Sequence, residues 1–351
     1  MSDVLRLARP DILELQPYQH AAWNPALERL HANEMPWRAT GDDSDAGLNR
    51  YPEPQPPALL DRLARLYGVP AEQILAGRGS DEAIDLLVRA FCRAGQDQVL
   101  VCPPTFGYYA VAARIQGAQV REVPLTGADF ALDVPAVIAA GRTAKLVFLC
   151  SPNNPTGNLI GEEAITAICR ALADSSLIVL DEAYVEFSGR ASLVARLPEF
   201  PNLVVLRTLS KAYALAGARC GALIACPAIV ALLARILPPY ALPASSVEAV
   251  LRLTAERQRR QAAARIETLR AERETLRARL GELPGVRRVF PSDTNFVLVQ
   301  FAAPQAALSA AAAVGLLVRD LSANPRLPGC LRVTVGTPEQ NARLLAALER
   351  V

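Results

Sequence analysis

Residues 145–184 read KLVFLCSPNNPTGNLIGEEAITAICRALADSSLIVLDEAY, and this stretch decides the fold that the sequence predicts. Two continuous apolar runs, residues 145–150 and 177–180, are typical of buried central strands in a parallel sheet. Residues 161–173 have helical spacing and lie between the two runs. A strand, a helix and a second strand in this order indicate an α/β layer with a mainly parallel sheet.

The same alternation continues on both sides of this unit. We expect a large domain from residue 41 to residue 244, with further helices at 57–67, 80–93 and 108–116 and strands at 98–101, 119–123, 203–206 and 221–225. Ser80 is the expected N-cap of the second of these helices. Residues 245–280 contain neither Gly nor Pro and predict one long helix that ends at Gly281. With residues 286–351, this helix predicts a small α+β domain over residues 245–351, which the segment 1–40 would complete.

The composition limits the kinds of protein that the chain can be. With 351 residues, 51% of them hydrophobic, the chain can build a large core and two domains. The net charge of +2 includes no basic block, which argues against a nucleic-acid partner. Only His20 and His31 are histidines, so a zinc site or a Ser-His-Asp triad is improbable. Seven cysteines without a C-x-x-C pair, no signal-peptide pattern and no unbroken apolar span favour a cytoplasmic protein away from membranes.

The chain has only two lysines, Lys145 and Lys211, among 37 basic residues. Lys211 lies in the run TLSKAYALAGARCG, residues 208–221. Arginine keeps its proton near neutral pH, whereas a desolvated lysine can lose it and attack an aldehyde to form a Schiff base. The hypothesis is therefore covalent attachment of pyridoxal phosphate (PLP) at Lys211; the plain alternative is an ordinary surface lysine.

PLP also needs a carboxylate for its pyridine nitrogen and donors for its ring hydroxyl. Asp181 directly follows the buried run 177–180, which places it at the carboxyl edge of the sheet, where open α/β folds bind ligands. Asn154, in SPNNPTG, and Tyr184 are candidate donors to the ring hydroxyl. The plain alternatives are a cap or turn after the strand for Asp181, an ordinary turn for Asn154 and a core aromatic for Tyr184.

The phosphate of PLP needs a cradle of donors, and two groups of residues offer one. GRGSDE, residues 77–82, precedes a helix, so backbone amides there could point at an anion. Hydroxyls and a guanidinium on both sides of Lys211 form the second group. The candidates are Ser80, Asp81, Glu82, Thr208, Ser210 and Arg219. Each signal is weak alone, but one α/β region that supplies the amine, the carboxylate, the donors and the cradle indicates a PLP enzyme.

At these motifs the chain resembles the fold-type I PLP-dependent aminotransferases over nearly its whole length. Within that superfamily it is similar to the histidinol-phosphate aminotransferase family. The runs that match are LNRYPEPQP (48–56), GRGSDE (77–82), CPPTFGYY (102–109), RTLSKAYALAG (207–217) and LRVTVG (331–336). The resemblance implies a reaction of L-histidinol phosphate with 2-oxoglutarate that gives imidazole acetol phosphate and L-glutamate, in histidine biosynthesis.

The resemblance also implies roles for single residues. Lys211 would move the proton, Phe106 would stack on the cofactor where the family more often has Tyr, and Arg332 would hold the substrate phosphate or a glutamate carboxylate. Arg319 and Tyr18 would assist at the phosphate; the alternative for both arginines is an ordinary salt bridge at a domain edge. A homodimer with shared active sites is implied, in which Tyr51 reaches the cofactor phosphate of the neighbouring subunit.

The chain departs from the family pattern in the segment LHANEMPW, residues 30–37. His31 and Met35 stand where the family commonly has asparagines, while Asn33 is kept as a candidate substrate contact. Substrate preference could therefore differ near this segment.

Other functions remain open. On the same fold, an aromatic amino-acid aminotransferase or a threonine-phosphate decarboxylase would use a similar site. A PLP-sensing regulator would carry a DNA-binding module, but only about 40 residues precede the large domain, without a basic helix pair. A purely structural α/β protein would not require this set of residues.

Overall fold

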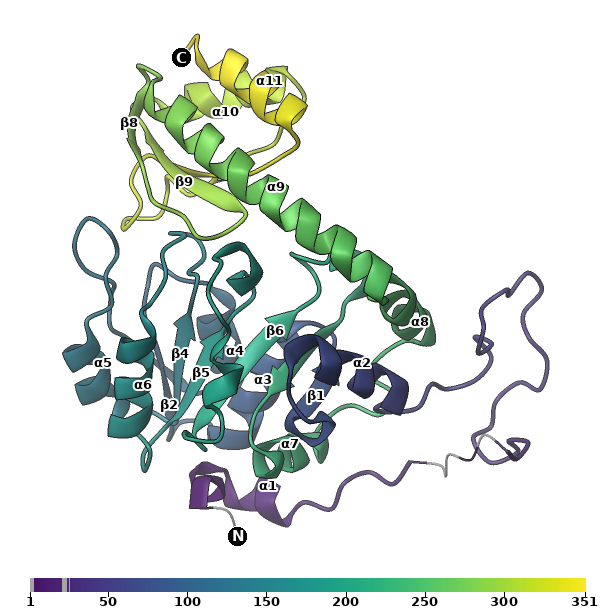
Figure 1. Cartoon of the computed structure of the whole chain (residues 1–351). Coiled ribbons are helices and arrows are strands. Elements are labelled where there is room, and N and C mark those ends of the chain that lie inside the picture. The colour runs from purple at the N-terminus through teal and green to yellow at the C-terminus, as the bar shows by residue number, and fades with distance from the viewer. Residues whose placement is uncertain (1–2, 21–23, 25) are drawn as a thin grey trace.

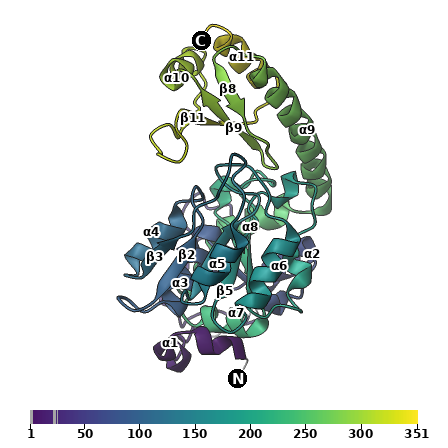
Figure 2. The ribbon, with the colours of Figure 1, turned by 90° about the vertical axis from the view of Figure 1, so that its left-hand side faces the viewer.

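The computed structural model describes residues 3–20, 24 and 26–351 of the chain. It contains two sheets that lie in two different parts of the molecule (Figure 1). We call residues 57–253 the large part and residues 286–351 the small part. The long helix α9 (Glu256–Gly281) runs along one side and leads from the first to the second, as Figure 2 shows from another direction.

The large part is built on a seven-stranded sheet with the order β1-β7-β6-β5-β4-β2-β3. The five strands from β3 to β6 are parallel, and β7 is antiparallel to both of its neighbours. The mainly parallel sheet that the sequence predicts is thus confirmed. The strands are β1 (Ile74–Gly77), β2 (Gln98–Val101), β3 (Gln119–Glu122), β4 (Leu146–Cys150), β5 (Leu177–Asp181), β6 (Leu203–Thr208) and β7 (Gly221–Ile224).

Helices cover both faces of this sheet. Side chains of β4 alternate between the faces: Val147 and Leu149 belong to one apolar cluster, and Leu146 and Phe148 to the other. Because both faces are covered, β4 is apolar throughout and β5 is apolar up to Asp181 at its end. One face carries α2 (Pro57–Tyr67), α5 (Val134–Gly141) and α6 (Glu162–Ala171), and the other carries α3 (Ser80–Phe91), α4 (Tyr108–Ile115) and α7 (Pro227–Ala234).

The start of the described chain packs on the large part, at the end far from the small part (Figure 1). It forms a 3-10 turn, Asp3–Leu7, and the short helix α1 (Pro10–Glu14). Val4 and Leu7 are buried in the same apolar cluster as α3 and α7, and Arg9 donates from its backbone N to Ala90 O at 2.9 Å. The expectation that residues 1–40 complete the small domain is therefore wrong for this stretch. The division of the rest of the chain into two domains stays a prediction.

The single helix predicted for residues 245–280 is also wrong, because the chain breaks it in two. Helix α8 (Ala244–Leu253) ends before Thr254, and α9 starts at Glu256. Thr254 is fully buried and donates through Oγ1 to Val250 O at 2.6 Å. Arg62 of α2 donates to Leu251 O at 2.7 Å and to Thr254 Oγ1 at 3.2 Å. These side chains satisfy the final carbonyls of α8, so the backbone can leave the helix there.

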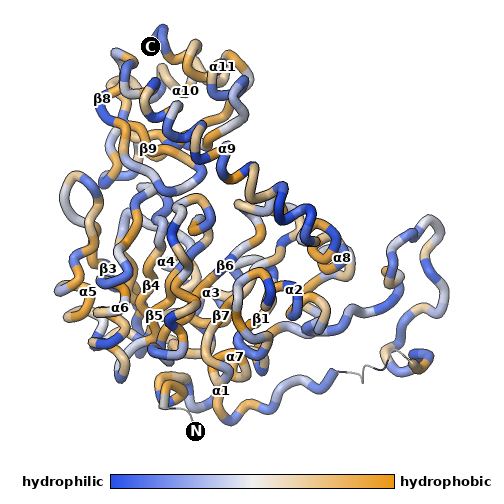
Figure 3. Tube along the Cα trace, viewed as in Figure 1, coloured by the Kyte–Doolittle hydropathy of each residue, from blue (hydrophilic) through white to orange (hydrophobic). Residues whose placement is uncertain are grey.

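The small part has a four-stranded antiparallel sheet in the order β10-β11-β9-β8. Apolar side chains of α9, α10 and α11 cover one of its faces, although Figure 3 shows the long helix to be largely hydrophilic along the rest of its course. Among the described residues, no helix is both long enough and apolar enough to cross a bilayer. The elements are β8 (Val286–Val289), β9 (Phe296–Phe301), α10 (Pro304–Ala313), β10 (Arg319–Asp320), β11 (Cys330–Thr334) and α11 (Pro338–Leu348).

Contacts from α9 and β8 hold the small part over the carboxyl edge of the large sheet. Arg273 of α9 is buried and donates to Phe187 O at 3.1 Å and to Thr294 O at 3.0 Å, which ties the two parts to one guanidinium. Arg288 forms an ion pair with Asp129 at 2.6 Å on the outside. These contacts reach the loops after β3 and β5, which carry Asp129 and Phe187.

A buried ion cluster lies beside this edge. Arg207 of β6 is 6% exposed and pairs with Glu182 at 3.5 Å and with Glu186 at 2.7 Å. Its guanidinium lies 4.7 Å from the ring centroid of Tyr67. Burial raises the pKa of Glu182, and the nearby Arg207 opposes that rise. The arginine thus compensates two carboxylates that water does not reach well.

We expect Arg207→Met to lower the free energy of unfolding by about 3–5 kcal/mol, because both carboxylates would stay buried without a cation. The matched control is Arg260→Met, which removes an exposed pair with Glu256 on α9 and should cost about 0–1 kcal/mol. Urea denaturation of both variants at pH 7 measures the difference. Equal losses in the two variants would show that the buried cluster contributes no special stability.

Candidate active site

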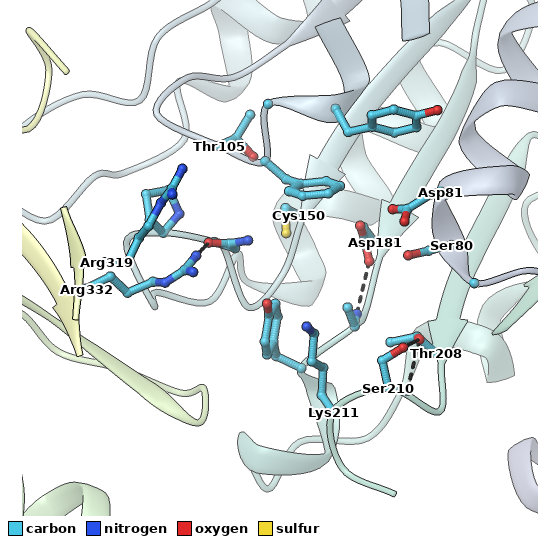
Figure 4. A pocket seen from close by; sticks show the side chains of 18 of the residues that line it. Ser80, Asp81, Thr105, Cys150, Asp181, Thr208, Ser210, Lys211, Arg319 and Arg332 are labelled. Carbon is cyan, nitrogen blue, oxygen red and sulfur yellow. Dashed lines mark hydrogen bonds between the residues drawn. The ribbon is translucent and has the colours of Figure 1, made fainter. Parts of the chain in front are cut away.

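A cavity of about 590 Å³ opens between the carboxyl edge of the large sheet and the small part (Figure 4). The strand register explains its position, because Cys150 of β4 pairs with Asp181 of β5, which pairs with Leu206 of β6. The loops after three parallel strands therefore meet at one place. The lining includes Gly79, Ser80, Asp81, Thr105, Phe106, Tyr108, Cys150, Asn154, Asp181, Ala183, Tyr184, Thr208, Ser210, Lys211, Arg219, Arg319, Leu321, Asn324 and Arg332.

Lys211 follows β6 and extends into this cavity (Figure 4). Its Nζ lies 6.0 Å from the ring centroid of Tyr184. Partial removal from water, and next the charge of Arg332, lower the pKa of the Lys211 amine. A lysine with a lowered pKa can lose its proton more readily, which is what a nucleophilic or proton-transferring amine requires.

Asp181 is the buried carboxylate of the site, with 3% of its surface exposed. Its Oδ2 accepts a hydrogen bond from Tyr109 Oη at 2.7 Å, and its Oδ1 accepts one from the Ala183 backbone N at 3.1 Å. Burial raises the pKa of Asp181 to about 6 despite these donors. In the part of the chain that the structure describes, no lysine or arginine forms an ion pair with it. The arrangement suits a cationic or protonated ligand atom that arrives from the cavity.

Donors gather on the large-part side of the cavity, around the start of α3 and near Asp181 (Figure 4). The helix has no side-chain cap, and Gly79 rather than the predicted Ser80 occupies its cap position. Gly79 has φ +86°, and a Cβ on Gly221 would lie 2.8 Å from Gly79 C, so both glycines permit a close approach of two backbones. Arg219 lies against this loop, with Nη2 3.3 Å from Asp81 Oδ2.

The hydroxyls of Thr208 and Ser210 complete this side of the cavity and hydrogen-bond each other at 3.0 Å. Helix amides, two hydroxyls and a guanidinium together form an anion site. Glu82 does not line the cavity, since its carboxylate turns back to accept from Arg78 N at 2.7 Å.

The small part supplies the cations on the other side. Arg319 and Arg332 are direct register partners on β10 and β11, so their side chains leave neighbouring positions (Figure 4). Arg332 donates through Nη1 to Asn154 Oδ1, and its guanidinium lies 5.2 Å from the Phe296 ring centroid. Burial lowers the pKa of Arg332. The two cations are adjacent, and the hydrogen-bond partner of Arg332 is a neutral amide, so the pair favours an anionic ligand.

Three predicted site residues lie away from this cavity, on the segment before α2 that Figure 1 shows running outside the compact body. Tyr51 stacks on Tyr240, with ring centroids 4.5 Å apart, and Tyr18 packs edge-on against His20. Asn33 has φ 57° in the same segment, which also carries His31 and Met35. None of the three lines the cavity of its own chain.

Several residues that line the cavity were not predicted from the sequence. Thr105 and Tyr108 flank Phe106, and Leu321 and Asn324 follow β10. The signal for Cys150 was available, because it ends an apolar strand directly before SPNNPTG. Tyr109, the donor to Asp181, belongs to the run CPPTFGYY and was not predicted as a site residue. No residue pattern singled out the loop after β10, whose place depends on how the small part packs.

The fold is that of a known class of enzyme. The family model for class I and II aminotransferases matches residues 28–348. The chain belongs to this family, and it is a transaminase. The predicted fold class is confirmed with it.

One relative shows which aminotransferases the chain is similar to. The chain is 53% identical to the histidinol-phosphate aminotransferase of Xylella fastidiosa (strain 9a5c), over 99% of this chain and 97% of that protein. The resemblance to histidinol-phosphate aminotransferases is thereby confirmed.

Solved structures are similar as well. The histidinol-phosphate aminotransferase of Sinorhizobium meliloti in complex with pyridoxal-5'-phosphate is 28% identical, with a TM-score of 0.76 over 86% of this chain and 82% of that one. The L-threonine-O-3-phosphate decarboxylase of Porphyromonas gingivalis is 26% identical, with a TM-score of 0.73 over 86% and 90%. An aminotransferase and a decarboxylase are thus both similar to this chain in fold, while the high identity is to the aminotransferase.

The raised pKa of Asp181 predicts a pH effect on the ligand-free protein. A carboxyl whose pKa rises from 3.8 to about 6 on folding contributes stability at low pH that is lost as the pH rises through about 6. Asp181→Asn removes this titration. We expect the stability of the variant relative to wild type to increase by about 1 kcal/mol between pH 5 and pH 8.

Urea denaturation of both ligand-free proteins at the two pH values measures this change. Glu349→Gln, at an exposed site on the surface near the C-terminus, is the control and should follow wild type. If the two proteins differ in free energy of unfolding by the same amount at both pH values, the raised pKa of Asp181 is contradicted.

Proposed function

We propose that the chain is a histidinol-phosphate aminotransferase that converts L-histidinol phosphate and 2-oxoglutarate to imidazole acetol phosphate and L-glutamate in histidine biosynthesis. The observation that carries the proposal is one cavity that combines the lysine and buried carboxylate of the large part with the paired arginines of the small part. The 53% identity to a relative of that name supports the choice of substrate.

We further propose PLP as the cofactor of this cavity. When bound, PLP supplies an electron sink for the bond that breaks at the substrate α-carbon. The residues present fit it at both ends. Asp181 is a buried carboxylate placed to accept from a protonated pyridine nitrogen, and the anion site formed by Ser80, Asp81, Thr208, Ser210 and Arg219 matches a phosphate.

The side chains between these ends would orient the ring and move the proton. Lys211, with its lowered pKa, would accept a proton from the substrate α-carbon and return it to the cofactor. Asn154 and Tyr184 would hold the ring oxygen, and the Phe106 ring would cover one face of the cofactor. Asp181 would keep the ring nitrogen protonated throughout.

Arg319 and Arg332 would bind the anionic end of each substrate. Arg332 would hold the phosphate of histidinol phosphate in one half-reaction and a carboxylate of glutamate in the other. Guanidinium groups suit both, because their planar donors match phosphate and carboxylate oxygens in pairs.

We propose that two copies of the chain share their active sites. Apolar side chains on the outer segment are strongly exposed, with Leu30 at 93% and Trp37 at 75%. A second copy would cover them, bring Tyr51 to the phosphate end of the neighbouring site, and place Tyr18 and Asn33 near the neighbouring substrate.

We also propose a cytoplasmic location. All seven cysteines are free thiols, which accords with it.

The direct test is the visible absorbance of the purified protein reconstituted with PLP. The reconstituted protein should be yellow. We expect L-histidinol phosphate, without any keto acid, to bleach this colour, and 2-oxoglutarate to restore it, because each substrate completes one half-reaction. A yellow protein that does not respond would overturn the substrate assignment. Aromatic amino acids and threonine phosphate are then tried, and released CO₂ would identify a decarboxylase.

The two lysines of the chain allow a matched pair of variants. Lys211→Ala should lower turnover by at least about 100-fold, because it removes the proton-transferring amine. Lys145→Ala removes the other lysine, next to β4 and outside the cavity, and should keep both colour and turnover. Steady-state rates with L-histidinol phosphate measure both. Full activity of Lys211→Ala would refute the role of this lysine.

A further inference from the structure

Tyr109 of α4 is a fully buried tyrosine whose hydroxyl reaches the active-site carboxylate. It is 0% exposed, and its Oη donates to Asp181 Oδ2 at 2.7 Å. The residue does not line the cavity, and the reaction steps above do not use it. A hydroxyl buried so deeply would be costly without a partner, and the carboxylate is the acceptor that the structure provides.

Aromatic contacts fix the direction of this hydroxyl. The Tyr109 ring stacks on Phe148 of β4, with centroids 4.8 Å apart and planes 9° apart. Phe106, which lines the cavity, contacts Tyr109 edge-on at 5.4 Å and 82°. The ring is therefore held between the sheet and the residue proposed to cover the cofactor, so its hydroxyl points at Asp181 from a rigid position.

Other groups around Asp181 do not replace this contact. The Ala183 amide occupies Oδ1, while the Cys150 thiol from β4, the Tyr184 phenol and the Lys211 amine face the carboxyl from other elements. Asp81 of α3 also faces it and, as a like charge, disfavours its ionised form. The Tyr109 hydroxyl is thus the side-chain donor that directly stabilises the carboxylate form against burial.

We propose that Tyr109 is a positioning residue that keeps Asp181 ionised. Its hydrogen bond to Oδ2 fixes the orientation of the carboxylate, so that the carboxylate faces a protonated ring nitrogen in the cavity. The inference rests on the proposed function for the identity of that nitrogen. It assigns Tyr109 no contact with substrate or cofactor, and its effect passes through Asp181.

Tyr109→Phe isolates the hydroxyl, because the ring and its packing on Phe148 and Phe106 stay. The matched control is Tyr67→Phe. Tyr67 is also buried at 6% exposure, but its hydroxyl has no hydrogen-bond partner among the described residues and it lies outside the cavity. A general effect of removing a buried phenol would appear in both variants.

The first measurement uses ligand-free protein and the pH dependence of its urea denaturation. Loss of the donor should raise the pKa of Asp181 by about one further unit. Because stability linked to a raised carboxyl pKa is lost as the pH rises through it, Tyr109→Phe should lose more stability than wild type between pH 6 and pH 8. Tyr67→Phe should parallel wild type, and in an Asp181→Asn background the pH-dependent effect of Tyr109→Phe should vanish.

The second measurement is the dissociation constant for PLP at pH 7.5. We expect roughly tenfold weaker binding for Tyr109→Phe, which corresponds to the loss of one hydrogen bond to a charged group, and no change for Tyr67→Phe. If wild type binds PLP and the two variants behave alike in both measurements, the positioning role is overturned while the proposed function stands. If wild type binds no PLP, the cofactor proposal fails, and the ligand-free series still decides whether Tyr109 controls Asp181.

Discussion

The burial of one negative charge, at Asp181, is the constraint on which the site depends. The carboxylate ends β5 in the middle of a sheet that helices cover on both faces, so water cannot compensate it. Two neutral donors, Tyr109 and the Ala183 amide, reduce the cost but leave the pKa raised to about 6. The folded chain thus carries an acceptor whose charge a protonated ligand would balance, and the parallel register brings the loops with Asn154 and Lys211 to the same edge.

The fold was predictable from sequence where the pattern was local. The apolar runs of β4 and β5 predict central strands because a strand covered on both faces has no polar side. The prediction failed where a distant residue decides the structure. Arg62 of α2 ends α8 at Thr254, nearly 200 positions along the chain, and no helical periodicity can report that contact. The strand β1 and the helices α5 and α7 were missed because their short runs of four and eight residues carry little periodic signal.

The site was predictable in a similar way. Motifs directly after strands, such as SPNNPTG after β4 and Asp181 at the end of β5, reach the cavity because strand ends fix their position. Tyr51 and Tyr18 lie on the segment before α2 and do not line the cavity of their own chain, so their predicted roles depend on the proposed second copy. Tyr109 was missed for a different reason. A tyrosine on a helix facing the sheet has the pattern of a core residue, and only the three-dimensional packing shows that its hydroxyl meets a carboxylate.

The repulsion between the paired arginines is the second electrostatic constraint on the cavity. Arg319 and Arg332 occupy facing positions of β10 and β11, and like charges so placed repel each other. Burial makes this worse for Arg332, whose pKa is lowered, and its partner Asn154 supplies only a neutral oxygen. An anion between the two guanidiniums would relieve both costs. A phosphate and a carboxylate each meet that need. Under the proposed function, this pair of cations would therefore let a single site accept histidinol phosphate and glutamate in turn. The same pair would discriminate against substrates without an anionic end.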